Sequence, residues 1–326
     1  MRSLIVGTGS YSPEKVLTNA DLEKIVDTND QWIVERTGIR ERHVAAESEA
    51  TSDLAYAAAV KALEMAKVAP EDVDLIIVGT VTPDMSFPST ACLVQGRLGN
   101  KKAAAFDVSA ACAGSLYALA VADRFVSTGM AKNALVIGAD TLTRITDWTD
   151  RNTCILFGDG AGAMVLQPTD DPRRGILSVH LHADGSYGHI LNMPGGGSRN
   201  PVSQKVIDER LPFIKMKGSE VYKVAVRALE EVCREALARN GVAASDLAQV
   251  IAHQANKRIL DSTLHRLGVP EEKCWMNLEK YGNTSSASVP TTLDEANRAG
   301  RLRPGDALLM MAIGGGMAWG SALVRW

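Results

Sequence analysis

Short apolar runs that alternate with helix-periodic segments constrain this chain more than any other feature. Leu75–Val78, Ala134–Ile137 and Val250–Ala252 have the length and continuous hydrophobicity of strands buried on both faces. Between such runs, Ser52–Ala66 and Ser219–Ala238 carry apolar residues at helical spacing. This alternation predicts an α/β fold with largely parallel sheets.

A weak internal repeat sharpens that prediction. Ala-Val-Lys-Ala-Leu-Glu at 59–64 resembles Ala-Val-Arg-Ala-Leu-Glu at 225–230, and each is followed by an acidic turn, an apolar strand and a helix that ends in Arg-Leu-Gly. Several matches in the same order favour duplication over coincidence. We therefore expect two similar halves, residues 1–172 and 173–326. The stretch His182–Leu211, which contains GGGS, is interpreted as a long surface loop between them.

Composition excludes several classes of protein. The 326 residues are 46% hydrophobic, which is typical of a globular chain, and the net charge of −3 provides no basic field for nucleic acid or for a membrane surface. No apolar run reaches the roughly 18 residues of a membrane span, and the N-terminus does not read as a signal peptide. The five cysteines are widely spaced and include no CxxC, which argues against disulfides or a zinc site and favours a reducing, cytoplasmic setting.

Cys112 is the first candidate for chemistry. A strand is expected to end near Val108 and a helix to begin near Ala113, which places this cysteine at a strand-to-helix turn. The unpaired N–H groups and positive end of the helix would favour the thiolate, the nucleophilic form. The alternative is an inert buried cysteine, since free cysteines are often buried.

Three further segments point to the same place. His253 follows an apolar strand, and ligands of α/β sheets collect beyond the carboxyl ends of strands. Asn283 occupies in the second half the place that Cys112 occupies in the first. Glycines 314–316 follow another apolar strand, and their N–H groups could stabilise an oxyanion. Each segment alone has an ordinary reading: a structural histidine, a capping turn and a glycine turn.

Taken together, these segments resemble the β-ketoacyl-acyl-carrier-protein synthase III family along the whole chain. The matching motifs are GTGSYSP at 7–13, WIVERTGIRER at 32–42, DVSAACAG at 107–114, FGDGAGA at 157–163, HQAN at 253–256, GNTSSAS at 282–288 and GGGMAWGSALVRW at 314–326. The resemblance implies a thiolase-like α/β fold, in which two similar halves form a layered α-β-α-β-α core. It also implies a five-stranded sheet in each half and an obligate homodimer.

The resemblance implies an activity as well. The enzyme would condense an acyl-CoA primer, expected to be acetyl-CoA, with malonyl-acyl-carrier protein and so initiate fatty acid synthesis. Cys112 would accept the acyl group, and the N–H groups of Cys112 and Gly316 would hold the oxyanion. His253 and Asn283 would complete the catalytic set, with no metal or other cofactor. A synthase of secondary metabolism with a longer or branched primer remains the alternative.

Substrate contacts follow from matched positions. Trp32 and Arg151 match a pair that sandwiches the CoA adenine, and Phe87 matches a residue that reaches across the dimer to limit the acyl pocket. The other matched substrate-binding residues are Arg36, Thr37, Phe157, Met216, Gly218, Tyr222 and Asn256. The surface that receives the acidic carrier protein matches Gln254, Ala255, Asn256, Lys257 and Arg258.

Three features of the sequence disfavour other classes of protein. Leu4–Gly9 suggests a nucleotide-binding oxidoreductase, but Ser12 stands where the third fingerprint glycine belongs and Pro13 follows it. Ala312 stands where a biosynthetic thiolase carries its second cysteine. A catalytically silent binding module is disfavoured because Cys112, His253 and Asn283 occur together.

Overall fold

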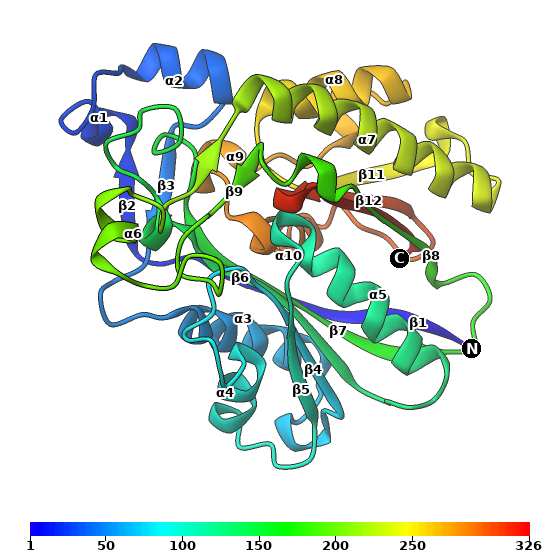
Figure 1. Cartoon of the computed structure of the whole chain (residues 1–326). Coiled ribbons are helices and arrows are strands. Elements are labelled where there is room, and N and C mark those ends of the chain that lie inside the picture. Colours follow the sequence, from blue (N-terminus) through cyan, green and yellow to red (C-terminus); the bar gives the residue numbers. More distant parts are fainter.

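A computed structural model describes residues 1–326, and two β-sheets organise it (Figure 1). The first sheet has the order β1 (Arg2–Tyr11), β7 (Asp159–Thr169), β6 (Ala134–Thr141), β4 (Leu75–Gly79) and β5 (Ala104–Val108). The second has the order β8 (Gly175–Ala183), β13 (Ala318–Arg325), β12 (Ala307–Gly314) and β11 (Leu247–Ala252). In the first sheet β4 pairs in parallel with β5 and β6, whereas β7 runs antiparallel to both of its neighbours.

The second sheet repeats the plan of the first with one strand fewer. Strands β8, β13, β12 and β11 have the order and relative directions of β1, β7, β6 and β4. Where a partner like β5 would lie, only a single bridge joins Val250 to Cys274. The implied five-stranded sheet is therefore found in the first half only. All strands of the first sheet lie within 2–169 and those of the second within 175–325, while the half boundaries at 172 and 173 stay a prediction.

Helices fill the space between the sheets and cover their outer faces. Helices α5 (Gly114–Ser127) and α10 (Ser288–Arg298) lie between the sheets, and one buried cluster joins their apolar residues to both sheets (Figure 1). Helices α3 (Thr51–Ala66) and α4 (Thr90–Arg97) cover the outer face of the first sheet, and α7 (Gly218–Asn240) and α8 (Lys257–Leu267) cover the second. The predicted layered α-β-α-β-α core is confirmed.

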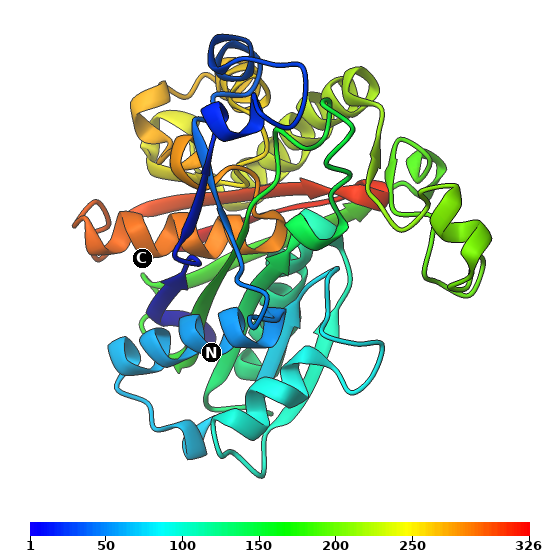
Figure 2. The same ribbon diagram turned by 90° about the vertical axis from the view of Figure 1, so that its left-hand side faces the viewer.

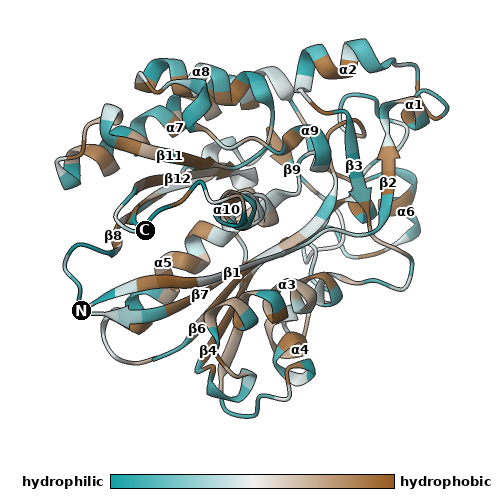
Figure 3. Cartoon of the chain, turned by 180° about the vertical axis from the view of Figure 1, so that it is seen from behind, coloured by the Kyte–Doolittle hydropathy of each residue, from teal (hydrophilic) through white to brown (hydrophobic).

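The hydropathy of each element explains its place. Every residue of β4, β6 and β12 is buried, which agrees with the uninterrupted apolar sequences of β4 and β12, whereas β6 ends in the buried polar residues Asp140 and Thr141. In Figure 3 hydrophobic residues concentrate in the strands, whereas the helices of the outer layers also present hydrophilic residues to the surface. The helix predicted over 219–238 is thus an outer helix with one buried face. None of the helices combines the length and apolarity needed to cross a membrane.

A smaller part with its own hydrophobic cluster stands beside the sheets. It contains the antiparallel pair β2 (Lys15–Thr18) and β3 (Glu41–Val44) together with α1 (Asn19–Leu22), α2 (Asp30–Thr37) and α9 (Leu278–Tyr281). Its cluster joins Ile33 and Ile39 to Phe157 and Ile214. The fully buried guanidinium of Arg42 ties this part to the first half, donating to the carbonyl of Ile155 at 2.7 Å. Short 3-10 turns complete the chain: η1 (Pro70–Asp72), η2 (Ala111–Ala113), η3 (Leu142–Ile145), η4 (Gly185–Tyr187), η5 (Ala244–Asp246), η6 (Glu271–Lys273), η7 (Ser285–Ala287) and η8 (Gly315–Met317).

The segment His182–Leu211 differs from the predicted structureless loop. It contains β9 (Leu191–Asn192), which pairs with β10 (Lys215–Met216), and helix α6 (Gln204–Asp208). Figure 2 shows the yellow-green part of this segment projecting from the body of the molecule. Because β8 already belongs to the second sheet, the segment lies within the second half and not between the halves.

Candidate active site

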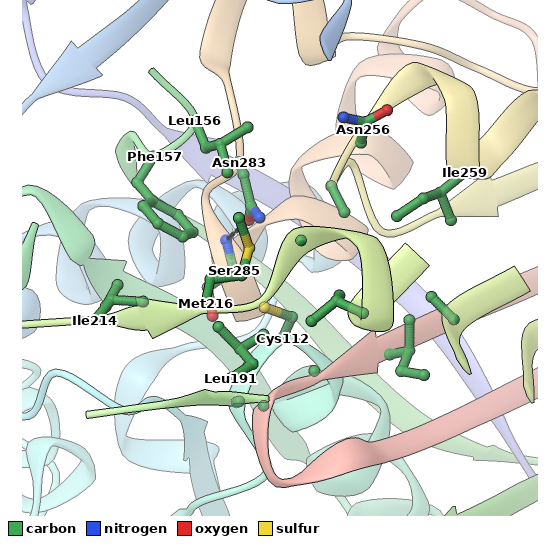
Figure 4. Close-up of a pocket in the computed structure, with 18 of the residues that line it drawn as sticks. Cys112, Leu156, Phe157, Leu191, Ile214, Met216, Asn256, Ile259, Asn283 and Ser285 are labelled. Carbon is green, nitrogen blue, oxygen red and sulfur yellow. Dashed lines mark hydrogen bonds between the residues drawn. The ribbon is translucent and has the colours of Figure 1, made fainter. Parts of the chain in front are cut away.

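A cavity of about 930 Å³ opens where the two halves meet the smaller part, and its lining is mostly apolar. Cys112, His253, Asn283 and the three glycines at 314–316 all line it. Figure 4 shows Cys112 and Asn283 pointing into one space, with Ser285 between them. The structure therefore brings together Cys112 of the first half and the polar groups of the second, as predicted for strand ends that face one another.

Cys112 lies in the turn η2, immediately before α5, and is 8% exposed. Its backbone is packed against the triple glycine: a Cβ atom on Gly314 would lie 2.4 Å from the backbone nitrogen of Cys112. Only glycine permits this approach. The close packing keeps the glycine turn against the nucleophile.

Three non-glycine residues at the site have left-handed backbone. Ala111, Ser285 and Met317 have φ values of 45°, 51° and 48°. Ala111 lies in η2 beside Cys112, and Met317 lies in η8 beside Gly316. Ser285 begins η7, two residues after Asn283. Backbone strain of this kind is found where the surrounding fold enforces a functional geometry.

Burial opposes ionisation of the Cys112 thiol in the free chain. Burial raises the pKa of Cys112 to about 12, although the Ser285 hydroxyl and the N–H groups of Cys112 and Gly315 oppose the shift. The sequence predicted the opposite direction from the helix start. Desolvation outweighs that effect because the sulfur is enclosed by segments from both halves.

His253 follows β11 and is a neutral imidazole. It is 4% exposed, and burial lowers its pKa to about 3. Its Nδ1 lies 2.5 Å from the hydroxyl oxygen of Ser288, the first residue of α10. Its Nε2 has no hydrogen-bond partner in the chain, which leaves that atom for a ligand in the cavity.

Asn283 is held at three points. Its N–H donates to the carbonyl of Leu156 at 2.8 Å, and its carbonyl accepts the N–H of Gly158 at 3.0 Å. Its side-chain Oδ1 accepts the N–H of Ser285 at 2.9 Å. Because the amide oxygen is occupied, the Nδ2 group is left to donate.

Two guanidinium groups lie over the ring of Trp32. Those of Arg36 and Arg151 each lie 4.6 Å from the centre of its ring. Trp32, Arg36 and Thr37 line the cavity, whereas Arg151 reaches the ring from outside and donates to the carbonyl of Asp27 at 2.8 Å. The Thr37 hydroxyl is used within α2, where it donates to the carbonyl of Ile33. A flat aromatic ring with flanking cations suits a planar, phosphate-bearing ligand.

The remaining predicted substrate contacts also line the cavity. They are Phe157, Met216, Gly218, Tyr222 and Asn256, together with Ala255 and Arg258 from the predicted carrier-protein surface. The Tyr222 hydroxyl lies 2.7 Å from that of Ser262, so its polar end is already partnered. The Asn256 side chain caps α8 and donates to the carbonyl of Arg36 at 2.9 Å. These two residues therefore offer the cavity more apolar surface than free polar groups.

Gln254 corrects one sequence expectation. Its side chain is not on the surface: the residue is 1% exposed, and its amide donates to the carbonyl of Ala252 and accepts the N–H groups of Asn277 and Leu278. Such a side chain cannot contact a carrier protein. It instead secures the loop that follows Trp275.

Phe87 and Lys257 lie outside the cavity. Phe87 is 83% exposed in the single chain. The ammonium group of Lys257 forms an ion pair with Asp261 at 2.7 Å.

Sequence reasoning did not single out Ser285, Ser288, Leu191 or Ile214, although both serines lie within the GNTSSAS motif that it did select. Leu191 lies in the segment 182–211 and Ile214 lies just after it, where no short motif marks either residue.

The two halves have similar layers and share one site, which contains a cysteine, a histidine and an asparagine from separate turns. These features define a condensing enzyme of the thiolase-like fold. Residues 106–185 match the family described as 3-oxoacyl-[acyl-carrier-protein (ACP)] synthase III, and residues 237–326 match the C-terminal part of that family. The chain belongs to the 3-oxoacyl-[acyl-carrier-protein] synthase III family.

Individual relatives agree along the whole chain. The sequence is 56% identical to a β-ketoacyl-[acyl-carrier-protein] synthase III of Desulfitobacterium hafniense over 322 residues, which cover 99% of this chain and 97% of that protein. It is 57% identical to the Xanthomonas campestris protein of the same name over 324 residues, covering 99% and 98%. The crystal structure of 3-oxoacyl-[acyl-carrier-protein] synthase III from Aquifex aeolicus has a TM-score of 0.93 at 49% identity, covering 99% and 100%. The predicted family, fold and class of reaction, an acyl transfer by condensation that initiates fatty acid synthesis, are confirmed.

Proposed function

We propose that this site joins an acyl group from acyl-CoA, with acetyl-CoA as the primer, to malonyl-acyl-carrier protein. The products are a 3-oxoacyl-acyl-carrier protein, CoA and carbon dioxide. The observation that carries the proposal is the convergence of Cys112, His253, Asn283 and the triple glycine on one enclosed, mostly apolar cavity. Trp32 also lines this cavity, and the two guanidinium groups over its ring suit the base and phosphates of CoA.

In the first step the sulfur of Cys112 attacks the carbonyl carbon of the acyl-CoA thioester. The oxyanion that forms is held by the N–H groups of Cys112 and Gly316, the latter at an exposed glycine that faces open space. The bond to the CoA sulfur then breaks, and the proton of the Cys112 thiol ends on the released CoA thiol. An acyl-cysteine remains.

In the second step the malonyl group loses its carboxylate as carbon dioxide. The electron pair of that carbon–carbon bond passes into an enolate, whose oxygen accepts hydrogen bonds from His253 and from the Nδ2 group of Asn283. The enolate carbon attacks the acyl-cysteine carbonyl, and the carbon–sulfur bond breaks. The Cys112 thiolate takes up a proton. A neutral donor suits this step, because it stabilises a negative oxygen without first requiring a charge inside an apolar cavity.

The proposed chemistry uses a thiol, backbone N–H groups and two side-chain donors, so acyl-CoA serves as a substrate and no metal or organic cofactor takes part. Arg258 supports a contact with the acidic carrier protein: it lines the cavity and lies over the ring of Tyr222. Lys257 contributes less free charge because Asp261 pairs with it. Five free thiols are consistent with the proposed cytoplasmic location.

We also propose a homodimer. Strand β5 pairs on one side only, with β4, so its other edge is open. The exposed hydrophobic side chains of Phe87 and Met85 precede α4, the helix that packs on β5. An open edge with apolar neighbours favours pairing with a second copy. In that dimer Phe87 would reach the partner's acyl pocket.

The test uses the purified chain in two stages. Incubation with acetyl-CoA should add one acetyl group, located on Cys112 by mass spectrometry of its peptides. Addition of malonyl-acyl-carrier protein should then release carbon dioxide and form acetoacetyl-carrier protein. A panel of straight and branched acyl-CoA primers identifies the preferred one, and faster product formation with a longer or branched primer would reject acetyl-CoA as the physiological substrate.

A further inference from the structure

Two cations begin helix α8, and the chain surrounds them differently. The ammonium group of Lys257 pairs with Asp261 at 2.7 Å and lies 3.7 Å from the carboxylate of Glu271. The guanidinium of Arg258 has no acidic partner in the chain, and its hydrogen bond to Asn256 comes from its backbone N–H. Arg258 is exposed and also lines the cavity. An unpaired positive charge therefore stands where the cavity opens to solvent.

The ring of Tyr222, on α7, faces this guanidinium. The central guanidinium carbon of Arg258 lies 5.9 Å from the centre of the ring, within the roughly 6 Å over which an aromatic face attracts a cation. A ring carries no net charge, so it holds a cation without cancelling its charge, as a carboxylate would. The contact therefore restrains a long side chain and leaves its charge available to a ligand.

A hydrogen bond at the far end of the ring fixes Tyr222 itself. Its hydroxyl oxygen lies 2.7 Å from that of Ser262, which is also on α8. Ser262 follows Arg258 by four residues, and residues at that spacing share one face of a helix. The tyrosine thus contacts α8 at two points that are one turn apart. Turning the ring away from Arg258 would break the bond to Ser262.

We propose that Tyr222 is a positioning residue that holds the Arg258 guanidinium, as free positive charge, at the opening of the cavity for an acidic group of the carrier protein. The Ser262 hydroxyl supports this role by fixing the ring. The inference rests on the proposed function, which assigns a carrier-protein contact to Arg258. It adds how the chain keeps that arginine both placed and charged.

Steady-state kinetics with malonyl-acyl-carrier protein test whether Tyr222 acts through Arg258. Arg258→Ala should raise the KM for this substrate on the order of tenfold, with little change in kcat. Tyr222→Leu, which keeps an apolar side chain but no ring, should raise the same KM about threefold. The double variant should lose no more than Arg258→Ala alone, because the ring has no guanidinium left to hold. Fully additive losses would overturn the role of Tyr222.

A second cycle tests the support from Ser262. Tyr222→Phe keeps the ring and removes the hydroxyl, whereas Ser262→Ala removes the partner of that hydroxyl. Each should raise the KM for malonyl-acyl-carrier protein roughly twofold, and the two together should raise it no further. A larger loss in the double variant than in either single variant would overturn the proposed support.

Salt dependence and two other cations of α8 provide the controls. The KM for malonyl-acyl-carrier protein should rise with salt, and less steeply in both Arg258→Ala and Tyr222→Leu, which a merely structural role of the ring would not cause. Lys257→Ala should raise KM less than Arg258→Ala, and Arg266→Ala, which removes a partner of Glu230 outside the cavity lining, should leave it unchanged. Equal losses in these variants would overturn the inference.

The two layers of the proposal fail separately. If Arg258→Ala leaves the KM for malonyl-acyl-carrier protein unchanged, the carrier-protein contact of the proposed function is wrong and the role of Tyr222 falls with it. If Arg258→Ala has its full effect and Tyr222→Leu has none, the contact stands and only the positioning role of Tyr222 is overturned.

Discussion

Asn283 and Phe157 form an isolated parallel β-bridge, so an amide assigned to catalysis and an aromatic wall of the cavity are held as one unit. Hydrogen bonds on both sides of the bridge, from Asn283 to Leu156 and from Gly158 to Asn283, reinforce it. Glycine is required behind the bridge: a Cβ on Gly158 would lie 2.4 Å from the carbonyl oxygen of Tyr281. Asn283, for which we propose a catalytic role, is therefore placed by an aromatic residue of the cavity wall.

Asn283→Asp should separate the two half-reactions. The substitution keeps the shape of the side chain and the oxygen that accepts the N–H of Ser285, but it replaces the Nδ2 donor with an acceptor. We expect malonyl decarboxylation to fall about 10²–10³-fold while acetylation of Cys112 proceeds. Rapid-quench measurement of the acetyl-enzyme and release of labelled carbon dioxide check both steps. A parallel loss of both would contradict the assigned role.

Cys112→Ala should abolish acyl capture, because the other four thiols lie outside the cavity lining. Intact mass after incubation with acetyl-CoA should show no added group. Cys92→Ala is the control, since this half-buried cysteine contacts the carbonyl of Ala105 away from the site. An acetyl group that persists in Cys112→Ala would place the nucleophile elsewhere.

Alkylation of Cys112 should report its raised pKa. Since burial raises the thiol pKa to about 12, the thiolate fraction in the free chain should grow about tenfold for each pH unit through the neutral and mildly alkaline range. The rate of iodoacetamide labelling, followed at the Cys112 peptide between pH 7 and 10, should rise without a plateau. A plateau near pH 7 would show an activated thiolate and would restore the effect of the helix start.

Trp32→Ala should weaken binding of acyl-CoA and leave the chemistry of the malonyl step intact. The ring is the aromatic surface proposed to stack on the CoA base, and cation–π contacts with Arg36 and Arg151 hold it. We expect the KM for acetyl-CoA to rise roughly tenfold, in keeping with about 1–1.5 kcal/mol for the loss of an aromatic stacking contact. Arg97→Ala disrupts a similar contact with Tyr56 on α3, far from the cavity lining, and should leave KM unchanged.

Gln254→Ala should destabilise the fold. Its buried amide bonds backbone groups of Ala252, Asn277 and Leu278, which would lose their partner without access to water. Unsatisfied buried groups cost about 1–3 kcal/mol each, so we expect the free energy of unfolding to fall by about 3 kcal/mol. Urea denaturation measures the change, with the exposed Gln31→Ala as control. A shift below about 0.5 kcal/mol would show that the loop needs no such anchor.

The sequence predicted what depends on local pattern. Continuous apolar runs marked β4, β6 and β11, and the repeat indicated two sheets whose strand ends face one site. It could not show the raised pKa of Cys112, because that value depends on how completely distant segments enclose the sulfur. The role of Gln254 was hidden for a similar reason: its motif resembles a surface loop, whereas its partners lie more than twenty positions away. The sequence also did not indicate that the second sheet lacks a fifth strand, whose place is taken by a single bridge between Val250 and Cys274.

The left-handed backbone at Ala111, Ser285 and Met317 has a consequence for how the molecule folds. Each such residue costs about 1–2 kcal/mol, or roughly 3–6 kcal/mol for the three, against a net stability that is commonly about 5–15 kcal/mol. The turns of Ala111 and Ser285 pack against each other and against strands of the opposite half, so an isolated half would lack the groups that hold them. Cys112 and its facing donors should therefore reach their final geometry only after the sheets have docked.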